Sequence, residues 1–330
     1  MPARVENPED FDGFHDEELA HLPELRVSDL HFRPQRRRAL PLFLFLATCL
    51  STFWVGVANW NPVPSLGNVR EMGQQIAANW GQGLLYMGAI LAVLLAHEMG
   101  HFLQTVRYRI PASFPLCIPL PINPFGTMGA VIGMDGLRAD RKQIFDIGIA
   151  GPLAGLVVAV PIMWLGVEQL TFTPVAVPLS DSIPNLELHN PLVVQWLIQL
   201  VHPEAVEQAR WIAIGEINAL FMAGWVGMLI TGLNMLPISQ LDGGHVIYAL
   251  FGHDSKSVAR TFTVAAILYV VVYLEQAVVW TPMLVLVILI GIHHPPTADD
   301  SVQLGPVRRM LGFLSLIIPV LCFPLLGFRT

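Results

Sequence analysis

Long apolar runs separated by short polar stretches are the main pattern along this chain. A helix needs roughly 20 apolar residues to cross a hydrocarbon core of about 30 Å. Four runs of this kind occur before residue 240, and they cover residues 40–60, 84–103, 144–165 and 211–236. The pattern therefore predicts four membrane-spanning helices in this part of the chain.

The C-terminal part of the chain carries three further apolar runs. Residues 258–273 and 277–292 are short and nearly adjacent, so we predict a tight helical hairpin there, and we predict a last span over residues 310–328. Taken together, the runs predict an all-α polytopic membrane protein with about six to seven transmembrane helices.

One apolar segment does not fit a helix. Residues 111–134 read "PASFPLCIPLPINPFGTMGAVIGM", and prolines this dense interrupt helical hydrogen bonding. Non-helical backbone at membrane depth must be buried in protein or line a wet cavity. We therefore expect a small membrane-associated β-hairpin region, in which Gly126 and Gly129 supply turns or close backbone approach.

The composition agrees with a membrane protein. Hydrophobic residues make up 54% of the 330 residues and charged residues 13%, against roughly 45–50% apolar usage in ordinary soluble domains. The three cysteines are far apart and form no CxxC pair, so they indicate neither a disulfide framework nor a thiolate zinc site. We expect the lipid bilayer among the partners and no nucleic acid.

The charges are unevenly distributed. If the arginines at 36–38 lie in the cytoplasm, alternating the spans places 15 of the 18 basic residues on that side, as the positive-inside rule requires. Nine of the 25 acidic residues fall within residues 1–30, so we expect residues 1–38 to form an acidic, disordered cytoplasmic tail. Because this stretch resembles no cleavable signal, the first apolar run is expected to be retained.

Ionisable residues interrupt the second apolar run at "LLAHEMGH". His97 and His101 are four residues apart, so on a helix they share one face and can converge on one metal ion. Glu98 follows the first histidine and can reach a water held by that metal, which is the arrangement of HExxH metalloproteases. Because ionisable groups within a span are costly, they indicate a functional site.

A third ligand is expected elsewhere at the same depth, since catalytic zinc usually has three protein ligands and one open position. The fourth run and its continuation read "LITGLNMLPISQLDGGHVIYAL", with Asn234, a helix break at Pro237 and then Asp242. On the predicted orientation, His101 and Asp242 both lie toward the cytoplasmic ends of their spans. Asp242 is therefore the candidate third ligand.

The two motifs together resemble the site-2 protease family of intramembrane zinc metalloproteases. "HEMGH" matches its HExxH helix, "NMLPISQLDG" matches its NxxPxxxxDG segment, and "FDIGIAGPLAG" resembles its glycine-rich span. The resemblance covers about residues 84–250 and includes a membrane-associated β-hairpin region. Many members also insert a PDZ domain between core spans, for which this sequence has no room.

The resemblance implies a role for each motif residue. His97, His101 and Asp242 would hold one zinc ion per chain, Glu98 would act as the general base, and Asn234 would help to place the substrate carbonyl or its oxyanion. The implied substrates are transmembrane segments of other membrane proteins. The implied location is a multi-pass integral protein of a bacterial inner membrane, with its N-terminus in the cytoplasm.

The chain is accordingly divided into four parts. Residues 1–38 are the tail, 39–83 the first transmembrane helix and an outer loop, 84–250 the catalytic core, and 251–330 the C-terminal transmembrane helices. The sequence leaves the oligomeric state open.

Other kinds of protein fit the pattern less well. A non-proteolytic zinc-binding membrane scaffold, sensor or transporter is the main alternative. A transporter should show ligands along a path or in two repeated halves, whereas one cluster at one depth is predicted here, and an inactive binder would be expected to have lost Glu98. A soluble zincin with a membrane anchor conflicts with the apolar motif helix.

Several further polar residues are given structural roles. We expect Asn218 and Glu216 to snorkel or to form helix–helix hydrogen bonds, and Asp146 to cap its helix or to pair with Arg141. His245 is either a partner of the metal site or a packing residue. His293 and His294 are placed at the membrane interface.

Overall fold

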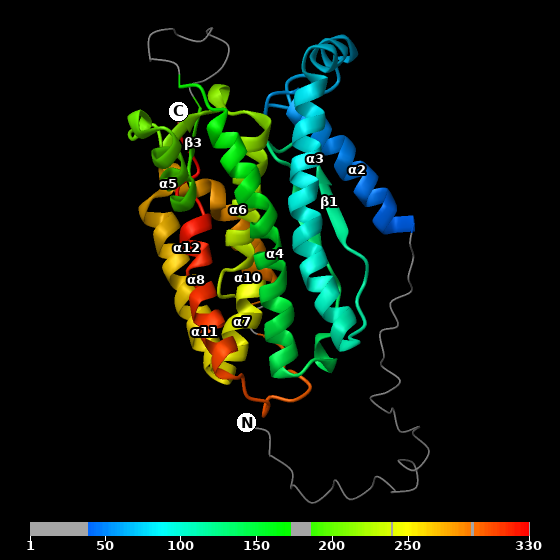
Figure 1. The fold of residues 1–330 in the computed structure, drawn as a ribbon, viewed down its shortest axis with the longest axis vertical. Coiled ribbons are helices and arrows are strands. Elements are labelled where there is room, and N and C mark those ends of the chain that lie inside the picture. The colour runs from blue at the N-terminus through cyan, green and yellow to red at the C-terminus, as the bar shows by residue number, and fades with distance from the viewer. Residues whose placement is uncertain (1–38, 173–185, 239, 292–293, 330) are drawn as a thin grey trace, which may run out of the picture. The chain divides into compact units, whose positions relative to one another are not determined.

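The computed structural model describes residues 39–172, 186–238, 240–291 and 294–329, and within these ranges the chain is mostly helical (Figure 1). The predicted acidic tail, residues 1–38, lies outside the described residues. The described part contains four helices long and apolar enough to cross a membrane, and they are Ala39–Val57, Val69–Tyr108, Arg141–Glu168 and Asp242–Val272. Shorter apolar helices accompany them, so the expected count of six to seven spans is not confirmed.

The helices before the second motif follow the apolar runs. They are α2 (Ala39–Val57), α3 (Val69–Tyr108), α4 (Arg141–Glu168), α5 (Leu192–Val201) and α6 (Ala219–Asn234). Helices α3, α4 and α6 pack against one another, and α2 packs on the outer side of α3 (Figure 1).

The remaining helices are mostly short. They are α7 (Asp242–Phe251), α8 (Ser255–Val272), α9 (Leu274–Ala277), α10 (Thr281–Ile290), α11 (Pro306–Ser315) and α12 (Ile318–Cys322). Helices α7 and α8 together make up the candidate span Asp242–Val272. The predicted last span over residues 310–328 is thus divided between α11 and α12, and it ends in an extended segment.

Helix α3 is longer than the second apolar run, because residues expected in an outer loop are helical. Asn68 caps its start by accepting a hydrogen bond from the backbone N–H of Glu71 at 3.3 Å. The backbone leaves helical geometry at Asn79, whose side chain donates to the carbonyl of Val57 at 3.0 Å. Polar capping and a bond to α2 therefore extend this helix beyond its apolar stretch.

Helix α6 is shorter than the fourth apolar run. The run was predicted to begin at residue 211, but Trp211–Ala213 forms strand β4 and the helix begins after Asn218. Asn218 accepts a hydrogen bond from the backbone N–H of Phe221 at 2.9 Å and donates to the carbonyl of Gly166 at 2.8 Å. The predicted helix–helix hydrogen bond is therefore present, and the same side chain fixes the start of α6.

The predicted β-hairpin is present between α3 and α4. Strands β1 (Leu116–Leu120) and β2 (Gly126–Val131) pair antiparallel, with a register shift between Cys117 and Pro119. Gly126 and Gly129 have φ values of 75° and 97°, which side chains with a Cβ rarely adopt. The Ser51 hydroxyl of α2 donates to the carbonyl of Gly126 at 2.6 Å and so joins the hairpin to the helices.

A separate three-stranded antiparallel sheet is formed by strands that lie far apart in the sequence. Its strand order is β4 (Trp211–Ala213), β3 (Glu187–His189) and β5 (Phe328–Arg329). The Trp225 indole of α6 donates to the carbonyl of His189 at 3.1 Å, which ties the sheet to the helices.

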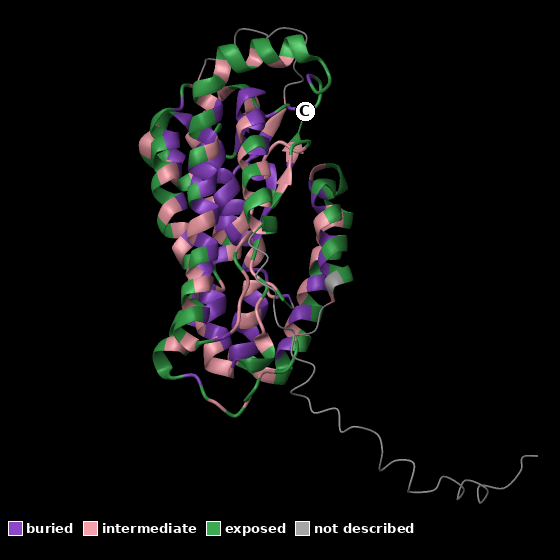
Figure 2. Cartoon of the chain, turned by 90° about the vertical axis from the view of Figure 1, so that its right-hand side faces the viewer, coloured by how far each residue is buried: buried purple, intermediate pink, exposed green. Residues whose placement is uncertain are grey.

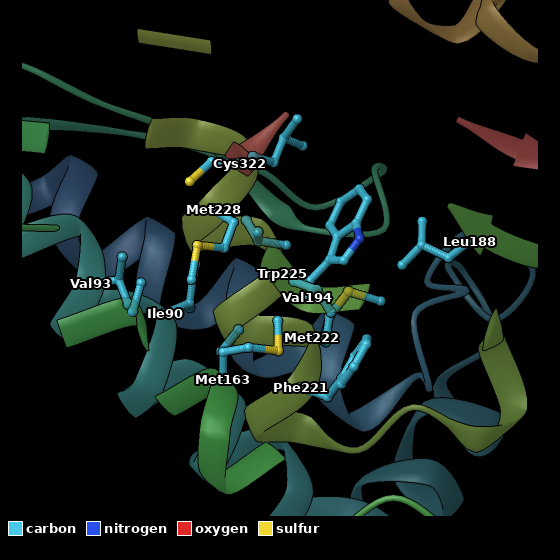
Figure 3. Close-up of a cluster of buried hydrophobic side chains, with 14 of the residues drawn as sticks. Ile90, Val93, Met163, Leu188, Val194, Phe221, Met222, Trp225, Met228 and Cys322 are labelled. Atoms are coloured by element: carbon cyan, nitrogen blue, oxygen red, sulfur yellow. The ribbon is translucent and has the colours of Figure 1, made fainter. Parts of the chain in front are cut away.

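The apolar core surrounds α6. Figure 2 shows buried residues along the inner helices and exposed ones along the outer faces. Phe221, Met222, Trp225 and Met228 of α6 pack with Ile90 of α3 and with Met163 of α4 (Figure 3). Burial of these large side chains positions the inner faces of α3 and α4, which carry the site described next.

Candidate metal centre

Two histidines of α3 and one aspartate of α7 bring their donor atoms together. His97 and His101 are buried on one face of α3, with ring centroids 5.0 Å apart. Nε2 of His97 lies 3.2 Å from Oδ2 of Asp242, and Nε2 of His101 lies 3.3 Å from the same oxygen. All the donor atoms lie within 4.8 Å of one another.

The turn between α6 and α7 positions Asp242. Helix α6 ends at Asn234, and α7 begins at Asp242 after the break predicted at Pro237. A Cβ placed on Gly243 would lie 2.1 Å from the carbonyl oxygen of Met235. Only glycine therefore lets α7 begin this close to the end of α6. The same turn brings Nδ2 of Asn234 to 3.2 Å from Nε2 of His97.

Three glycines of α4 seat imidazoles of this region. A Cβ on Gly151 would lie 2.0 Å from Nε2 of His101, and a Cβ on Gly155 would lie 3.1 Å from Nδ1 of His97. A Cβ on Gly148 would lie 2.8 Å from Cβ of His245. These glycines belong to the segment "FDIGIAGPLAG" noted in the sequence, and the structure shows that imidazole rings are what they accommodate.

The hydrogen bond of His101 orients its ring for a cation. Its Nδ1 lies 2.8 Å from the carbonyl oxygen of Ile147. A carbonyl only accepts, so Nδ1 carries a proton, and in the neutral ring the lone pair of Nε2 faces Asp242. Two electron-rich atoms at 3.3 Å repel each other unless a proton or a metal cation lies between them. This arrangement, in which the second ring nitrogen donates to a backbone carbonyl, is the usual one for a metal-binding histidine.

The donor set fits zinc. Two imidazole nitrogens and one carboxylate oxygen are ligands that zinc prefers, and a three-ligand set leaves a position open for water. The buried Nδ1 of His97 has no hydrogen-bond partner within the described part of the chain. The ring meets polar side chains through Nε2, which lies near Asp242 and Asn234.

A cavity of about 160 Å³ opens beside these ligands. Glu98, only 4% exposed, lines it together with His101, Asn234 and Asp242, and residues 130–132 of the hairpin line it as well. A buried carboxylate next to a candidate metal site and a small cavity is suited to proton transfer to or from a water molecule. Four of the five predicted site residues therefore line this cavity, and the fifth, His97, adjoins them through its contacts with Asp242 and Asn234.

Asp146 was expected to cap its helix or to pair with Arg141, and it does neither, since Asp140 caps α4. Asp146 does not pair with Arg141; it binds Arg308 of α11 through two hydrogen bonds of 2.8 and 2.9 Å and accepts a hydrogen bond from the Tyr108 hydroxyl. Arg141 instead donates to the carbonyl of Ala249 at 2.8 Å. Asp146 lies five residues after Arg141, so it is turned about 140° from Arg141 around α4. The packing of α11 on α4 supplies Arg308 as a cation with better geometry.

The sequence did not predict a contact between two further histidines. Nδ1 of His245 lies 2.7 Å from Nε2 of His294. His294, which was expected only at the membrane interface, therefore also packs against a residue of α7. Burial lowers the pKa of His294 below its usual value. His293 lies outside the described residues. The sequence placed His245 near the site because it follows Asp242 by three residues. It gave no signal for the contact with His294, which lies 49 residues further along the chain.

Comparison with known proteins gives a consistent result. Residues 85–276 match the model of peptidase family M50. The probable zinc metalloprotease EGY1, chloroplastic, of Arabidopsis thaliana is 31% identical over 237 residues, which cover 70% of this chain and 41% of the relative. The corresponding protein of Oryza sativa subsp. japonica is 32% identical over 166 residues, covering 50% and 28%.

A second group of relatives is more distant. The probable zinc metalloprotease EGY2, chloroplastic, of Arabidopsis thaliana is 24% identical over 249 residues, which cover 72% of this chain and 41% of the relative. The chain thus spans less than half the length of these curated relatives. No solved structure matches. Because the relatives carry chloroplastic names, they give no support to the expected bacterial inner membrane.

Proposed function

The chain belongs to peptidase family M50, the site-2 protease family of zinc metallopeptidases, and on this premise we propose that it is an intramembrane endopeptidase. It would cleave transmembrane segments of membrane-protein substrates. The observation that carries the proposal is the clustering of three candidate zinc ligands beside a cavity that the buried Glu98 lines.

We assign one zinc ion per chain to His97, His101 and Asp242. When bound, zinc supplies Lewis acidity, which polarises the scissile carbonyl and makes a water molecule more acidic. Glu98 takes the proton of the attacking water and later passes it to the leaving amine. The Asn234 amide donates toward the carbonyl oxygen as negative charge develops on it.

A transmembrane substrate must unwind before it can be cleaved, because helical hydrogen bonds shield its peptide groups. Strand β2 offers a place for the unwound segment. Among the described residues β2 pairs only with β1, and residues 130–132 line the site cavity. Addition of the substrate as an extra strand on β2 would supply main-chain hydrogen bonds close to Glu98.

The test is cleavage by purified protein in detergent micelles or liposomes. A panel of single-span substrates is incubated with wild type, with Glu98→Gln and with chelator-treated wild type. We expect untreated wild type to cleave and the other two samples not to cleave. Returning zinc to the chelated sample should restore its cleavage. Cleavage that survives Glu98→Gln would refute the mechanism.

Zinc binding is measured separately from cleavage. Elemental analysis of the purified protein should give one zinc per chain for wild type and for Glu98→Gln. Asp242→Ala should lower zinc content or affinity at least tenfold. Zinc binding without cleavage of any substrate would favour the alternative of a non-proteolytic zinc-binding membrane protein.

A further inference from the structure

His245 shares the cavity with the proposed catalytic groups but has no part in the mechanism above. It lies one helical turn after Asp242 on α7 and lines the same cavity. It is not among the three side chains whose donor atoms cluster. Gly148 nevertheless accommodates it, as Gly151 and Gly155 accommodate the two histidines of α3. The glycine face of α4 is thus shaped for three imidazoles and not for two.

A chain of hydrogen bonds determines which nitrogen of His245 carries the proton. Nδ1 of His294 lies 2.5 Å from the carbonyl oxygen of Pro295, which only accepts, so His294 carries its proton on Nδ1. The lowered pKa of His294 keeps the ring neutral, and its Nε2 is therefore an acceptor. Nδ1 of His245, at 2.7 Å, must then be the donor. This leaves Nε2 of His245 with a free lone pair.

His294 is held in place by residues 294–300, a strap that follows α10 in the chain. The backbone N–H of Ala298 donates to the carbonyl of Ala139, just before α4, at 2.9 Å. The Tyr248 hydroxyl donates to the Asp300 carboxylate at 2.9 Å, and the Tyr248 ring stacks on His294 with centroids 4.2 Å apart. The strap therefore fixes His294 against α7, and His294 in turn fixes the ring of His245.

We propose that His245 is a substrate-binding residue, whose Nε2 accepts a hydrogen bond from a backbone N–H of the unwound substrate. The inference rests on the proposed function, because it needs a peptide in this cavity. An unwound peptide buries N–H groups that have lost their helical acceptors, and each costs free energy until it finds a new one. Among the described residues no partner occupies Nε2 of His245, whereas Glu98, His101, Asn234 and Asp242 of the same cavity already have proposed roles in hydrolysis.

The binding test uses a substrate that wild type cleaves and the inactive Glu98→Gln background. In this substrate single backbone amides near the scissile bond are replaced one at a time by esters, which lack the N–H. We expect His245→Leu to weaken binding about threefold to tenfold, the usual effect of one lost hydrogen bond. At one ester position, the Glu98→Gln protein should lose the same factor in binding affinity. In the double variant Glu98→Gln/His245→Leu, that ester should weaken binding no further.

Two variants separate this role from a general effect on structure. His245→Gln places an amide oxygen at a similar reach and should retain most of the binding. His253→Gln changes an exposed histidine two residues beyond α7 and should bind as wild type does. The proposal would be overturned if every ester weakened binding equally with and without the His245→Leu substitution.

A spectroscopic measurement tests the hydrogen-bond chain without any activity. In zinc-loaded protein labelled with ¹⁵N-histidine, the resonances of His245 are identified by their loss in His245→Gln. We expect a protonated Nδ1 and an unprotonated Nε2, and a mixture of the two tautomers in His294→Leu. A protonated Nε2 in wild type would overturn the inference while leaving the proposed function intact. If wild type cleaves no substrate, the proposed function fails first and the binding role fails with it.

Discussion

Gly151 of α4 lies directly against the imidazole of His101 on α3, so close that a Cβ on the glycine would be 2.0 Å from Nε2. This nitrogen is the atom that faces Asp242. The position of one candidate zinc ligand therefore depends on the absence of a side chain on a neighbouring helix.

The first prediction concerns this contact. Gly151→Ala should displace the His101 ring and lower zinc affinity at least tenfold, as disturbance of a ligand's support commonly does. Overpacking should also lower the free energy of unfolding by ~1–3 kcal/mol. Zinc affinity is measured by competition with a chelator. Gly88→Ala is the matched control, because a Cβ there meets nothing within 4 Å, and an equal loss in that variant would contradict the explanation.

A second prediction concerns the ion pair that joins α11 to α4. Arg308→Met and Asp146→Asn should each lower the free energy of unfolding by ~1–3 kcal/mol, because the bidentate pair is partly buried and losing one partner leaves the other unsatisfied. In the double variant, the free energy of unfolding should fall by less than the sum of the two single losses. Unfolding in mixed micelles measures each value. Arg309→Met, at the exposed neighbouring position, should change stability by less than ~0.5 kcal/mol.

A third prediction concerns Asn218, which both caps α6 and bonds to α4. Asn218→Ala should lower the free energy of unfolding by ~1–2 kcal/mol, since it removes a capping acceptor and a donor to the carbonyl of Gly166. Asn68→Ala removes only an exposed cap of α3 and should cost less. Equal losses in the two variants would show that the bond to α4 adds nothing.

A fourth prediction concerns pH. His189 of β3 is buried beside Trp211, and burial together with the positive charges of Arg210 and Arg329 lowers its pKa to about 4. Between pH 6.5 and about 4 the unfolded chain therefore binds more protons than the folded chain at this residue. Its contribution to stability is complete above pH 6.5 and is lost as the pH falls through this range, by at most ~3 kcal/mol.

The measurement is the thermal unfolding midpoint in detergent between pH 4 and 7.5. His189→Gln should flatten the dependence on pH in this range, although other groups will retain theirs. Parallel curves for wild type and the variant would contradict the assignment to His189.

The candidate site residues could be named from the sequence because their signal is local. The spacing of His97, Glu98 and His101 follows helical periodicity, and the asparagine and aspartate of the second motif lie on either side of a proline that ends a helix. The proline-rich stretch likewise predicted the hairpin. The proposed division of the chain at residues 38, 83 and 250 stays a prediction.

Elements whose limits depend on partners were placed less well. The starts of α3 and α6 are set by Asn68 and Asn218, which act through capping and through bonds to neighbouring helices, and not through hydropathy. Asp146 had a cation nearby in the sequence, yet it binds Arg308, 162 residues away. Such choices depend on which helices pack together.

The sequence by itself determined the apolar helices, the hairpin and the five candidate site residues, because periodicity, proline content and motif spacing are properties of neighbouring residues. Only the tertiary structure decided that the glycines of α4 seat imidazoles and that His294 fixes the ring of His245. These relationships join residues that lie 49 or more positions apart in the sequence. They arise from close packing of side chains between helices, which no local pattern encodes.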